Sequence, residues 1–210
     1  MLLRSVCQAD PPVSGRLPII VGITGPQGCG KTTLCASLLA GLGALGIKAA
    51  ASSMDDFYLP TKFLSPVVFL GENCSGQKLL PRRGPPGTHD INLCRSVLES
   101  IKQRKPNIML PKYDKSQMNG RGDRSNEAVL LDATDIDVFL LEGWMLGFRH
   151  VDPKVLTGSL KDYEPLYAYI DLWLVVKVSN SNSSCNRCSN STLPSFATKA
   201  SETSKSAYSQ

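Results

Sequence analysis

The sequence lacks the features that mark secreted, membrane-spanning or disulfide-bonded proteins. Its first seven residues form too short an apolar run for a secretion signal, and no stretch of the 210 residues approaches a membrane span. The seven cysteines are odd in number and scattered, which favours a reducing compartment over a disulfide framework. We therefore expect a cytoplasmic protein, or an organellar one if a targeting segment precedes this chain.

Patterns for binding zinc or nucleic acid are also missing. The only two histidines, His89 and His150, lie far upstream of Cys185 and Cys188, so this cysteine pair lacks the further ligands that a zinc site needs. The net charge is +5, but the basic residues gather near polar motifs and form no stripe interleaved with aromatic residues. We expect no nucleic-acid partner and no membrane partner, and the sequence does not predict an oligomeric state.

Composition indicates one folded domain with a polar segment on each side. A chain with 42% hydrophobic and 20% charged residues has the composition of a globular protein. Residues 1–16 are expected to be a flexible lead-in because prolines and glycine interrupt any helix there. Residues 179–210 contain 11 Ser and 4 Asn and few large apolar groups, which predicts a disordered tail. The folded domain is expected to span residues 17–178.

The most informative stretch is a glycine-rich loop at residues 25–32, which fits the pattern Gly, any four residues, Gly-Lys-Thr. An apolar run with branched side chains precedes it at residues 17–24, and a Leu- and Ala-rich stretch follows at residues 33–45. Strand, loop and helix in this order place loop amides and a helix N-terminus around an anion. The loop therefore predicts a site for a nucleotide triphosphate.

Each residue type in the loop suits a nucleotide triphosphate. Glycines let backbone amides approach phosphate oxygens, Lys31 is expected to reach the β- and γ-phosphates in a catalytic role, and Thr32 is expected to bind Mg²⁺. The residues predicted to bind ATP form one uninterrupted run: Gly25, Pro26, Gln27, Gly28, Cys29, Gly30, Lys31, Thr32 and Thr33.

Further strands and one further helix complete the expected fold. Strands are expected at residues 47–53, 128–131 and 136–141, and a last buried parallel strand at residues 171–178. A helix is expected at residues 91–104, capped by Asp90, whereas residues 61–80 fit neither a helix nor a strand. This alternation predicts an α/β fold with a doubly wound, mostly parallel sheet and helices on both faces.

Carboxylates follow two of the expected strands, where open parallel sheets place their sites. Phosphoryl transfer from a nucleotide to an alcohol needs a carboxylate near the attacking hydroxyl of the acceptor molecule. Asp55 is predicted to be the catalytic base that accepts the proton of this hydroxyl, and Asp56 competes for the role. An Asp-Asp pair at a strand end also occurs as a turn or helix cap. Glu142 follows residues 136–141 and is predicted to bind Mg²⁺ together with Thr32, directly or through water; the alternative is a turn residue.

Loop cations are available to bind an anionic acceptor. This group comprises Arg82, Arg83, His89, Lys112, Lys115 and Arg124. Arginine binds a carboxylate or a phosphate through two parallel hydrogen bonds, although each of these side chains, taken singly, also suits a solvated loop.

Six motifs taken together resemble the D-glycerate 3-kinase family of plants and fungi. They lie at residues 25–33, 53–59, 83–90, 110–116, 122–124 and 141–148. That family is similar to uridine kinase, phosphoribulokinase and pantothenate kinase, all of which use ATP and Mg²⁺ to phosphorylate a small-molecule hydroxyl. The resemblance implies a fold of the P-loop NTPase type over about residues 17–178. It also favours Asp55 over Asp56, because the matching position is the base across the wider group.

The motifs of this resemblance contain the residues that we predict to bind the acceptor: Arg83, His89, Asp90, Lys112, Tyr113 and Arg124. The predicted reaction is ATP-dependent phosphorylation of a small carboxylate metabolite, D-glycerate to 3-phosphoglycerate. One alternative is a kinase for another small hydroxylated metabolite, like uridine or pantothenate kinase. The resemblance also implies an Arg-bearing lid helix and a last strand beyond the Trp173 segment, where this sequence has its Ser/Asn tail. We therefore expect a C-terminally truncated chain, and a catalytically impaired nucleotide-binding fragment is the other alternative.

Overall fold

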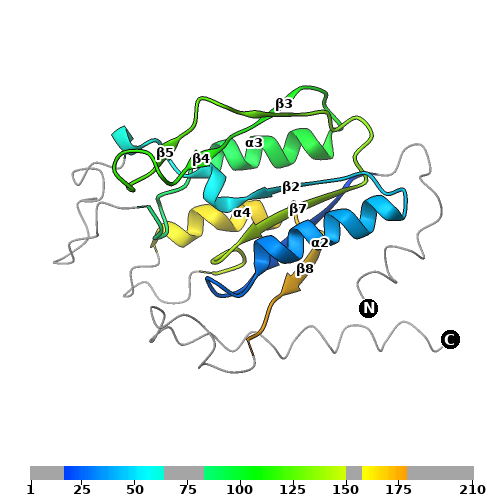
Figure 1. The fold of residues 1–210 in the computed structure, drawn as a ribbon, viewed down its shortest axis with the longest axis horizontal. Helices are drawn as coiled ribbons and strands as arrows, with labels where there is room; N and C mark the ends of the chain where they lie inside the picture. Colours follow the sequence, from blue (N-terminus) through cyan, green and yellow to red (C-terminus); the bar gives the residue numbers. More distant parts are fainter. Residues whose placement is uncertain (1–16, 64–82, 150–157, 179–210) are drawn as a thin grey trace.

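A four-stranded parallel sheet forms the centre of the molecule. The computed structural model describes residues 17–63, 83–149 and 158–178. The sheet has the order β2-β7-β1-β8, with β1 at Ile19–Thr24, β2 at Ala49–Ser53, β7 at Val138–Gly143 and β8 at Leu172–Val175 (Figure 1). β1 and β2 both pair with β7, which lies much later in the sequence. Segments that are far apart along the chain are therefore neighbours in the sheet.

The two central strands are apolar because helices cover both of their faces. Every residue of β7 is buried, and only the ends of β1 are partly exposed. Side chains alternate between the two faces as the strand period requires, since Ile20 packs in one apolar cluster and Val21 and Ile23 pack in the other. The expectation of an α/β fold with a mostly parallel sheet is confirmed.

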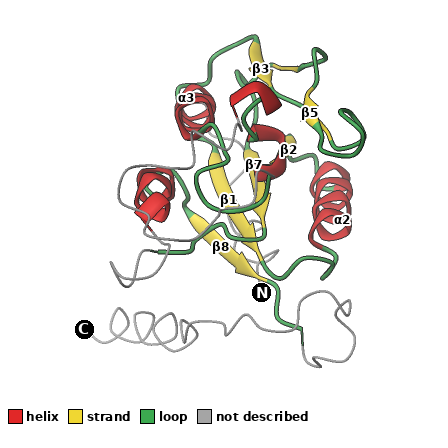
Figure 2. Cartoon of the chain, turned by 90° about the vertical axis from the view of Figure 1, so that its left-hand side faces the viewer, coloured by secondary structure: helices red, strands yellow, loops and turns green. Residues whose placement is uncertain are grey.

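Helix α2 covers one face of the sheet and helices α3 and α4 cover the other, as Figure 2 shows. α2 spans Lys31–Ala44, α3 spans Ile91–Lys102 and α4 spans Glu164–Tyr167. α3 buries Cys94, Val97, Leu98 and Ile101 at helical spacing, and the Asp90 side chain accepts a hydrogen bond from the Leu93 amide. Asp90 therefore caps the helix as expected, and the helix ends two residues before the predicted boundary.

The last strand differs from its expectation. The sequence predicts a buried strand, but β8 lies at the edge of the sheet and alternates between partly buried and exposed side chains. Trp173 and Val175 are 38% and 58% exposed. An apolar run does not distinguish a central strand from an edge strand, because the tertiary structure decides whether a further strand pairs with it.

Two small antiparallel pairs lie beside the main sheet. β3 (Ile108–Leu110) pairs with β6 (Val129–Leu131), and β4 (Tyr113–Asp114) pairs with β5 (Asp123–Arg124). We refer to residues 113–124 as the β4–β5 hairpin. Three short 3₁₀ helices, η1 (Met54–Phe57), η2 (Thr61–Phe63) and η3 (Gly158–Tyr163), complete the described chain. η1 continues directly from β2 and carries both predicted aspartates.

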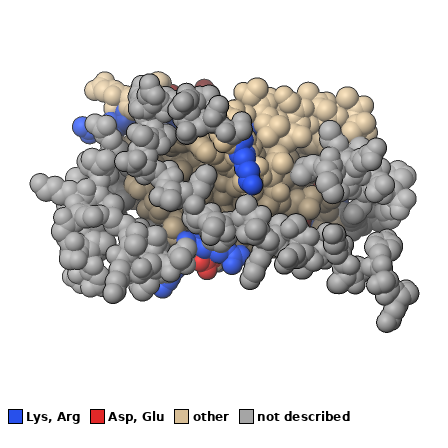
Figure 3. All heavy atoms as spheres, turned by 90° about the horizontal axis from the view of Figure 1, so that it is seen from below, with Lys and Arg blue, Asp and Glu red and all other residues tan. Residues whose placement is uncertain are grey.

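Several expectations lie outside the described residues. They include the lead-in, the Ser/Asn tail with Cys185 and Cys188, most of residues 61–80, Arg82 and His150. Within residues 17–63, 83–149 and 158–178, no helix is long and apolar enough to cross a membrane. On the face drawn in Figure 3, described Lys and Arg side chains occur as small separate groups.

Candidate active site

The phosphate loop joins β1 to α2 with two residues in the left-handed backbone region. Gly28 has φ 73° and Gly30 has φ 86°, conformations that residues with a Cβ rarely adopt. Gly30 is also the N-cap of α2, and no side chain caps this helix. The first amides of a helix lack intrahelical acceptors, so the loop and the helix start together form an anion site built from backbone.

Gly25 is required by packing as well as by phosphate chemistry. A Cβ at this position would lie 2.8 Å from the Val176 carbonyl oxygen and 3.1 Å from the Cys29 sulfur. The Val176 amide also donates to the Thr24 carbonyl, which holds the end of β8 against the end of β1. The close approach of β8 therefore fixes the start of the loop.

Lys31 lies buried at the inner side of the loop. Its ammonium donates to the carbonyl oxygens of Gly25 and Pro26 at 2.9 and 2.8 Å. A buried ammonium needs such acceptors, and carbonyls of the phosphate loop keep it next to the loop amides. The arrangement brings a positive charge to the backbone anion site.

Thr32 and Glu142 meet as the predicted Mg²⁺ ligands. The Thr32 hydroxyl donates to Glu142 Oε1 at 3.1 Å, although the two residues are 110 positions apart. Hydroxyl and carboxylate oxygens suit Mg²⁺, which takes one or two protein oxygens and completes its shell with water and phosphates. The pair fits that ion. Among the described residues no group of three or more His, Cys, Asp or Glu could hold a metal by itself.

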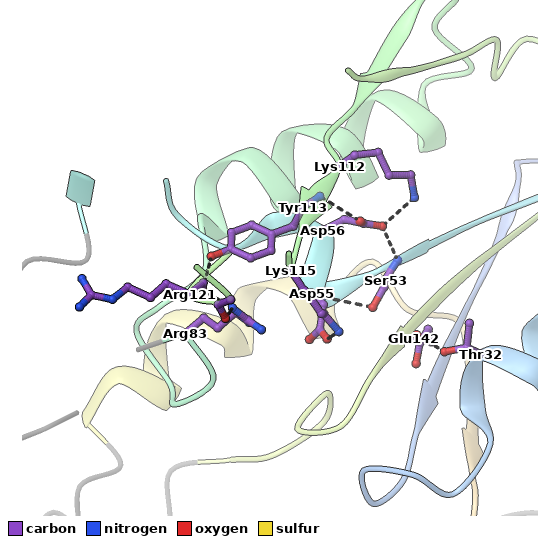
Figure 4. A network of polar contacts seen from close by, with 11 residues as sticks. Thr32, Ser53, Asp55, Asp56, Arg83, Lys112, Tyr113, Lys115, Arg121 and Glu142 are labelled. Carbon is purple, nitrogen blue, oxygen red and sulfur yellow. Dashed lines mark hydrogen bonds and ion pairs between the residues drawn. The ribbon is translucent and has the colours of Figure 1, made fainter. Parts of the chain in front are cut away.

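Strand register brings Asp55 to the same edge of the sheet. Ser53 in β2 and Ile23 in β1 both lie opposite Glu142 in β7. Asp55 follows Ser53 by two residues, so η1 begins beside the end of β7, which carries Glu142; Figure 4 shows Asp55 together with the Thr32–Glu142 pair. The carboxyl ends of three parallel strands therefore converge on one site.

The two aspartates of η1 have different environments. Asp56 completes a capping box with Ser53, whose amide donates to Asp56 Oδ2 at 3.4 Å. Asp56 also accepts from Lys112 Nζ at 2.9 Å and from the Tyr113 amide at 3.3 Å (Figure 4). With its side chain only 12% exposed, Asp56 joins η1 to the start of the β4–β5 hairpin.

Asp55 is the more accessible carboxylate. Its side chain is 28% exposed, and Lys115 Nζ lies 2.6 Å from Oδ2. Burial raises the pKa of the neighbouring Tyr58 hydroxyl, and the Asp55 charge raises it further. The Tyr58 phenol therefore stays neutral, and Asp55 is the more exposed aspartate of the pair.

Four of the predicted acceptor residues have protein partners. Lys112 pairs with Asp56, and Arg124 donates to Asp90 at 3.4 Å and to the Tyr58 carbonyl at 2.9 Å. Arg83 donates to the carbonyls of Gly120 and Arg121. These contacts hold the β4–β5 hairpin against η1 and α3. Acceptor binding by Arg83, Asp90, Lys112 and Arg124 remains a prediction, and it requires these contacts to open or to be shared.

The other two predicted acceptor residues pack within aromatic contacts. His89 stacks on Tyr58 with ring centroids 4.2 Å apart, and its Nδ1 lies 2.7 Å from the Tyr163 hydroxyl. Burial lowers the pKa of His89 to about 4, against the opposing effect of the Asp55 charge. His89 Nε2 is buried and has no hydrogen-bond partner in the described parts of the chain. The ring of Tyr113 lies edge-on to Tyr58 and beneath the Arg83 guanidinium.

Sequence reasoning missed two residues that shape the site. Thr61 donates from its amide to Asp123 Oδ1 at 2.8 Å and from its hydroxyl to the Gly122 carbonyl at 2.5 Å. Tyr163 binds His89 across 74 positions of sequence. Neither has a local signal, because Thr61 starts a stretch without periodicity and Tyr163 lies in a 3₁₀ helix without a motif.

The fold and the site together define a protein class. A parallel sheet with helices on both faces, a phosphate loop between β1 and α2, and carboxylates at the ends of β2 and β7 are the features of a P-loop kinase fold.

Comparison with known proteins defines the family within this class. No model of a known protein family matches the chain. The chain is 36% identical over 178 residues to the chloroplastic D-glycerate 3-kinase of Arabidopsis thaliana, covering 78% of this chain and 38% of that protein. It is 34% identical over 186 residues to the uncharacterized kinase mug58 of Schizosaccharomyces pombe, covering 78% and 66%. The solved structure of D-glycerate 3-kinase from Cryptococcus neoformans superposes with a TM-score of 0.65 at 32% identity, covering 83% of this chain and 68% of that one.

The chain belongs to the D-glycerate 3-kinase family. It spans only 38% to 66% of the length of the two curated relatives.

Proposed function

We propose that this chain is an ATP-dependent kinase that phosphorylates a hydroxyl of D-glycerate to give 3-phosphoglycerate. The observation that carries this proposal is the register of β2 and β7. It sets Ser53 opposite Glu142, so that Asp55 lies beside the Thr32–Glu142 pair at the phosphate loop. The proposed base for an alcohol would thereby lie next to the proposed site for a metal-bound triphosphate, which is what in-line phosphoryl transfer requires.

The phosphate loop would hold the triphosphate. Amides of the loop and of the first turn of α2 would donate to phosphate oxygens, and Lys31 would turn from the Gly25 and Pro26 carbonyls toward the β- and γ-phosphates. Thr32 and Glu142 would hold Mg²⁺, which neutralises charge on the β- and γ-phosphate oxygens when it is bound. All of these residues lie on elements fixed by the buried sheet.

Asp55 would receive the proton of the acceptor hydroxyl. The hydroxyl oxygen attacks the γ-phosphorus, the bond from that phosphorus to the β,γ-bridging oxygen breaks, and ADP leaves with the bonding electrons. The proton passes to an Asp55 carboxylate oxygen. Asp56 does not serve in this role, because it is bound to Lys112 and to the amides of Ser53 and Tyr113.

D-glycerate is favoured as the acceptor for two reasons. Relatives that cover most of the chain carry the name D-glycerate 3-kinase. Asp55 itself lies within reach of an exposed ammonium, that of Lys115, which suits an acceptor bearing a negative charge near its hydroxyl.

The test is ADP formation by the purified protein with MgATP, measured with D-glycerate, glycerol, uridine or pantothenate and without acceptor. We expect turnover with D-glycerate and a fall in kcat of about 10²- to 10⁴-fold in Asp55→Asn. Asp135→Asn is the matched control, because Asp135 also pairs with a lysine but is exposed and far from the loop.

The outcomes separate the alternatives. Turnover with uridine or pantothenate but not with D-glycerate would replace the proposed acceptor. Stabilisation by ATP without turnover on any acceptor would contradict the proposed activity and leave a nucleotide-binding protein.

A further inference from the structure

In the described part of the chain, Lys115 forms its ion pair with the proposed base, Asp55. Its Nζ lies 2.6 Å from Asp55 Oδ2, and its side chain is 57% exposed, twice the exposure of Asp55. It follows β4 directly and reaches back across the site from the β4–β5 hairpin (Figure 4). The pair joins residues 60 positions apart, so the hairpin must be held in place for it to form.

Hydrogen bonds to the rest of the domain hold both ends of the β4–β5 hairpin. Asp56 binds Lys112 and the Tyr113 amide at the start, and Thr61 binds Gly122 and Asp123 at the return. These contacts fix the backbone on either side of Lys115, whereas its long side chain stays exposed.

A close backbone approach locks the return strand. A Cβ on Gly122 would lie 2.5 Å from the Tyr113 ring and 2.6 Å from Arg83 Nη1, and the residue has φ 78°. Only glycine fits there, and Arg83 closes over the same turn through the Gly120 and Arg121 carbonyls. Because the backbone around Lys115 is held and its side chain is exposed, the ammonium can change partners while the hairpin keeps its position.

The other basic residues around Asp55 have structural partners. Lys112 is bound by Asp56, which also caps η1, and Arg124 is bound by Asp90 and by the Tyr58 carbonyl. Opening these contacts would release the hairpin or the start of α3. Opening the pair between Lys115 and Asp55 breaks no backbone anchor, and an acceptor hydroxyl that takes Asp55 must open or share it.

We propose that Lys115 binds the anionic group of the acceptor and so selects hydroxy acids over neutral alcohols. This inference rests on the proposed function and goes beyond it by naming the residue that sets the acceptor class. In D-glycerate the carboxylate lies two carbons from the terminal hydroxyl. With that hydroxyl on Asp55, the carboxylate takes over the Lys115 ammonium, and one charge-assisted contact replaces another. Glycerol would open the same pair and offer the ammonium no charge in return.

The experiment compares D-glycerate with glycerol in wild type, Lys115→Met, Lys115→Arg and Lys48→Met. Lys48→Met is the matched control, since Lys48 forms an exposed pair with Asp135 away from the site. In Lys115→Met we expect KM for D-glycerate to rise about 10- to 100-fold, as for loss of a charge-assisted hydrogen bond, with kcat changing much less. Glycerol kinetics should stay within about 2-fold, Lys115→Arg should recover most of the preference, and Lys48→Met should match wild type.

One result would overturn the inference, namely an unchanged ratio of kcat/KM for D-glycerate over glycerol in Lys115→Met. If both values are unchanged, Lys115 does not contribute to acceptor binding. If both fall by the same factor, Lys115 acts only on Asp55 or on folding. Melting temperatures of all variants, measured with MgADP, separate the last two causes.

The inference has a second readout that does not need turnover. If wild type phosphorylates no acceptor, the proposed function fails, and calorimetric titration of D-glycerate into the MgADP complex then tests Lys115 alone. Binding that is at least about 10-fold weaker in Lys115→Met than in wild type would support the inference. Equal binding, or none to wild type, would overturn it.

Discussion

The two halves of the site are built in different ways. On the nucleotide side, the anion site consists of backbone amides in one continuous loop, and Lys31 binds carbonyls only five and six positions away. On the acceptor side, side-chain pairs span 56 positions for Lys112 with Asp56 and 60 positions for Lys115 with Asp55. The first half is mainly a local backbone structure, tied to β7 by the Thr32–Glu142 pair, and the second is a set of long-range side-chain contacts.

This difference predicts how each half responds to substitution. A side chain removed from the loop takes away charge but leaves the backbone that shapes the site. Removing Asp56 or Lys112 from the acceptor half takes away a contact that holds the hairpin against η1. Stability and activity should therefore separate on the nucleotide side and fall together for the acceptor-side residues that anchor the hairpin.

The largest effect is expected for Lys31→Ala. Loss of the ammonium removes a donor to the transferring phosphoryl group, and we expect kcat/KM to fall about 1,000-fold or more. The increase in melting temperature on adding MgATP should also shrink.

The stability of the Lys31→Ala variant tests whether the loop keeps its shape without this side chain. The free energy of unfolding in urea should stay close to that of wild type, because the glycines and β8 set the loop. A variant that unfolds far more easily would show that the loop depends on this side chain. It would contradict the proposed difference between the nucleotide side and the acceptor side.

A smaller effect, on stability against pH, is expected from His89. Its pKa is lowered to about 4 by burial, from 6.5 in the unfolded chain, so the unfolded state binds the extra proton first as the pH falls. This contribution to stability is complete above pH 6.5 and is lost as the pH falls toward 4. The slope is up to about 1.4 kcal/mol per pH unit, which sums to about 3 kcal/mol.

The His89 contribution is isolated by comparing wild type with His89→Gln in urea unfolding at several pH values. Glutamine does not titrate, so the difference between the two free energies should change between pH 6.5 and 4 and stay constant above it. Parallel curves over that range would show that His89 is protonated as easily in the folded protein as in the unfolded one.

The smallest of the three effects is expected for Asp56→Asn. This change keeps the shape of the capping residue but removes the charge that binds Lys112, and we expect a loss of about 1 to 3 kcal/mol in the free energy of unfolding. KM for the acceptor should rise together with the loss of stability, because the hairpin is then held less firmly.

Asp135→Asn is the control for Asp56→Asn, since it breaks an exposed lysine pair and should leave both quantities unchanged. Full stability with full activity in Asp56→Asn would remove Asp56 from the structural role assigned to it.

Sequence patterns predicted the strands around the phosphate loop and the Asp90 cap well. The loop, the strands before it and at β2 and β7, and the Asp90 cap all occur where apolar runs and turn residues place them. The exposed edge position of β8 could not be predicted, because an apolar strand has the same pattern whether or not a further strand covers its edge. The resemblance to a family favoured Asp55 over Asp56, and the contacts of Asp56 supply a physical reason for the same choice.

Acceptor-side residues were predicted as a group but not individually. The sequence marks Arg83, Lys112, Lys115 and Arg124 as cations in polar loops. It does not say that Lys112 and Arg124 hold the framework while Lys115 reaches Asp55. Only two residues separate Lys112 from Lys115, and the different partners of the two lysines depend on how the short strand β4 packs against η1.

The sequence by itself determined where the phosphate loop lies, because such a loop is made mainly by neighbouring residues with particular backbone angles and amides. It also determined the parallel sheet, since buried strands must be apolar on both faces. Only the tertiary structure decided which aspartate is bound by Lys112 and the Tyr113 amide and which one is paired with Lys115. Those assignments depend on contacts between segments about 60 residues apart, whose formation is set by packing of the whole domain and leaves no periodic pattern in the chain.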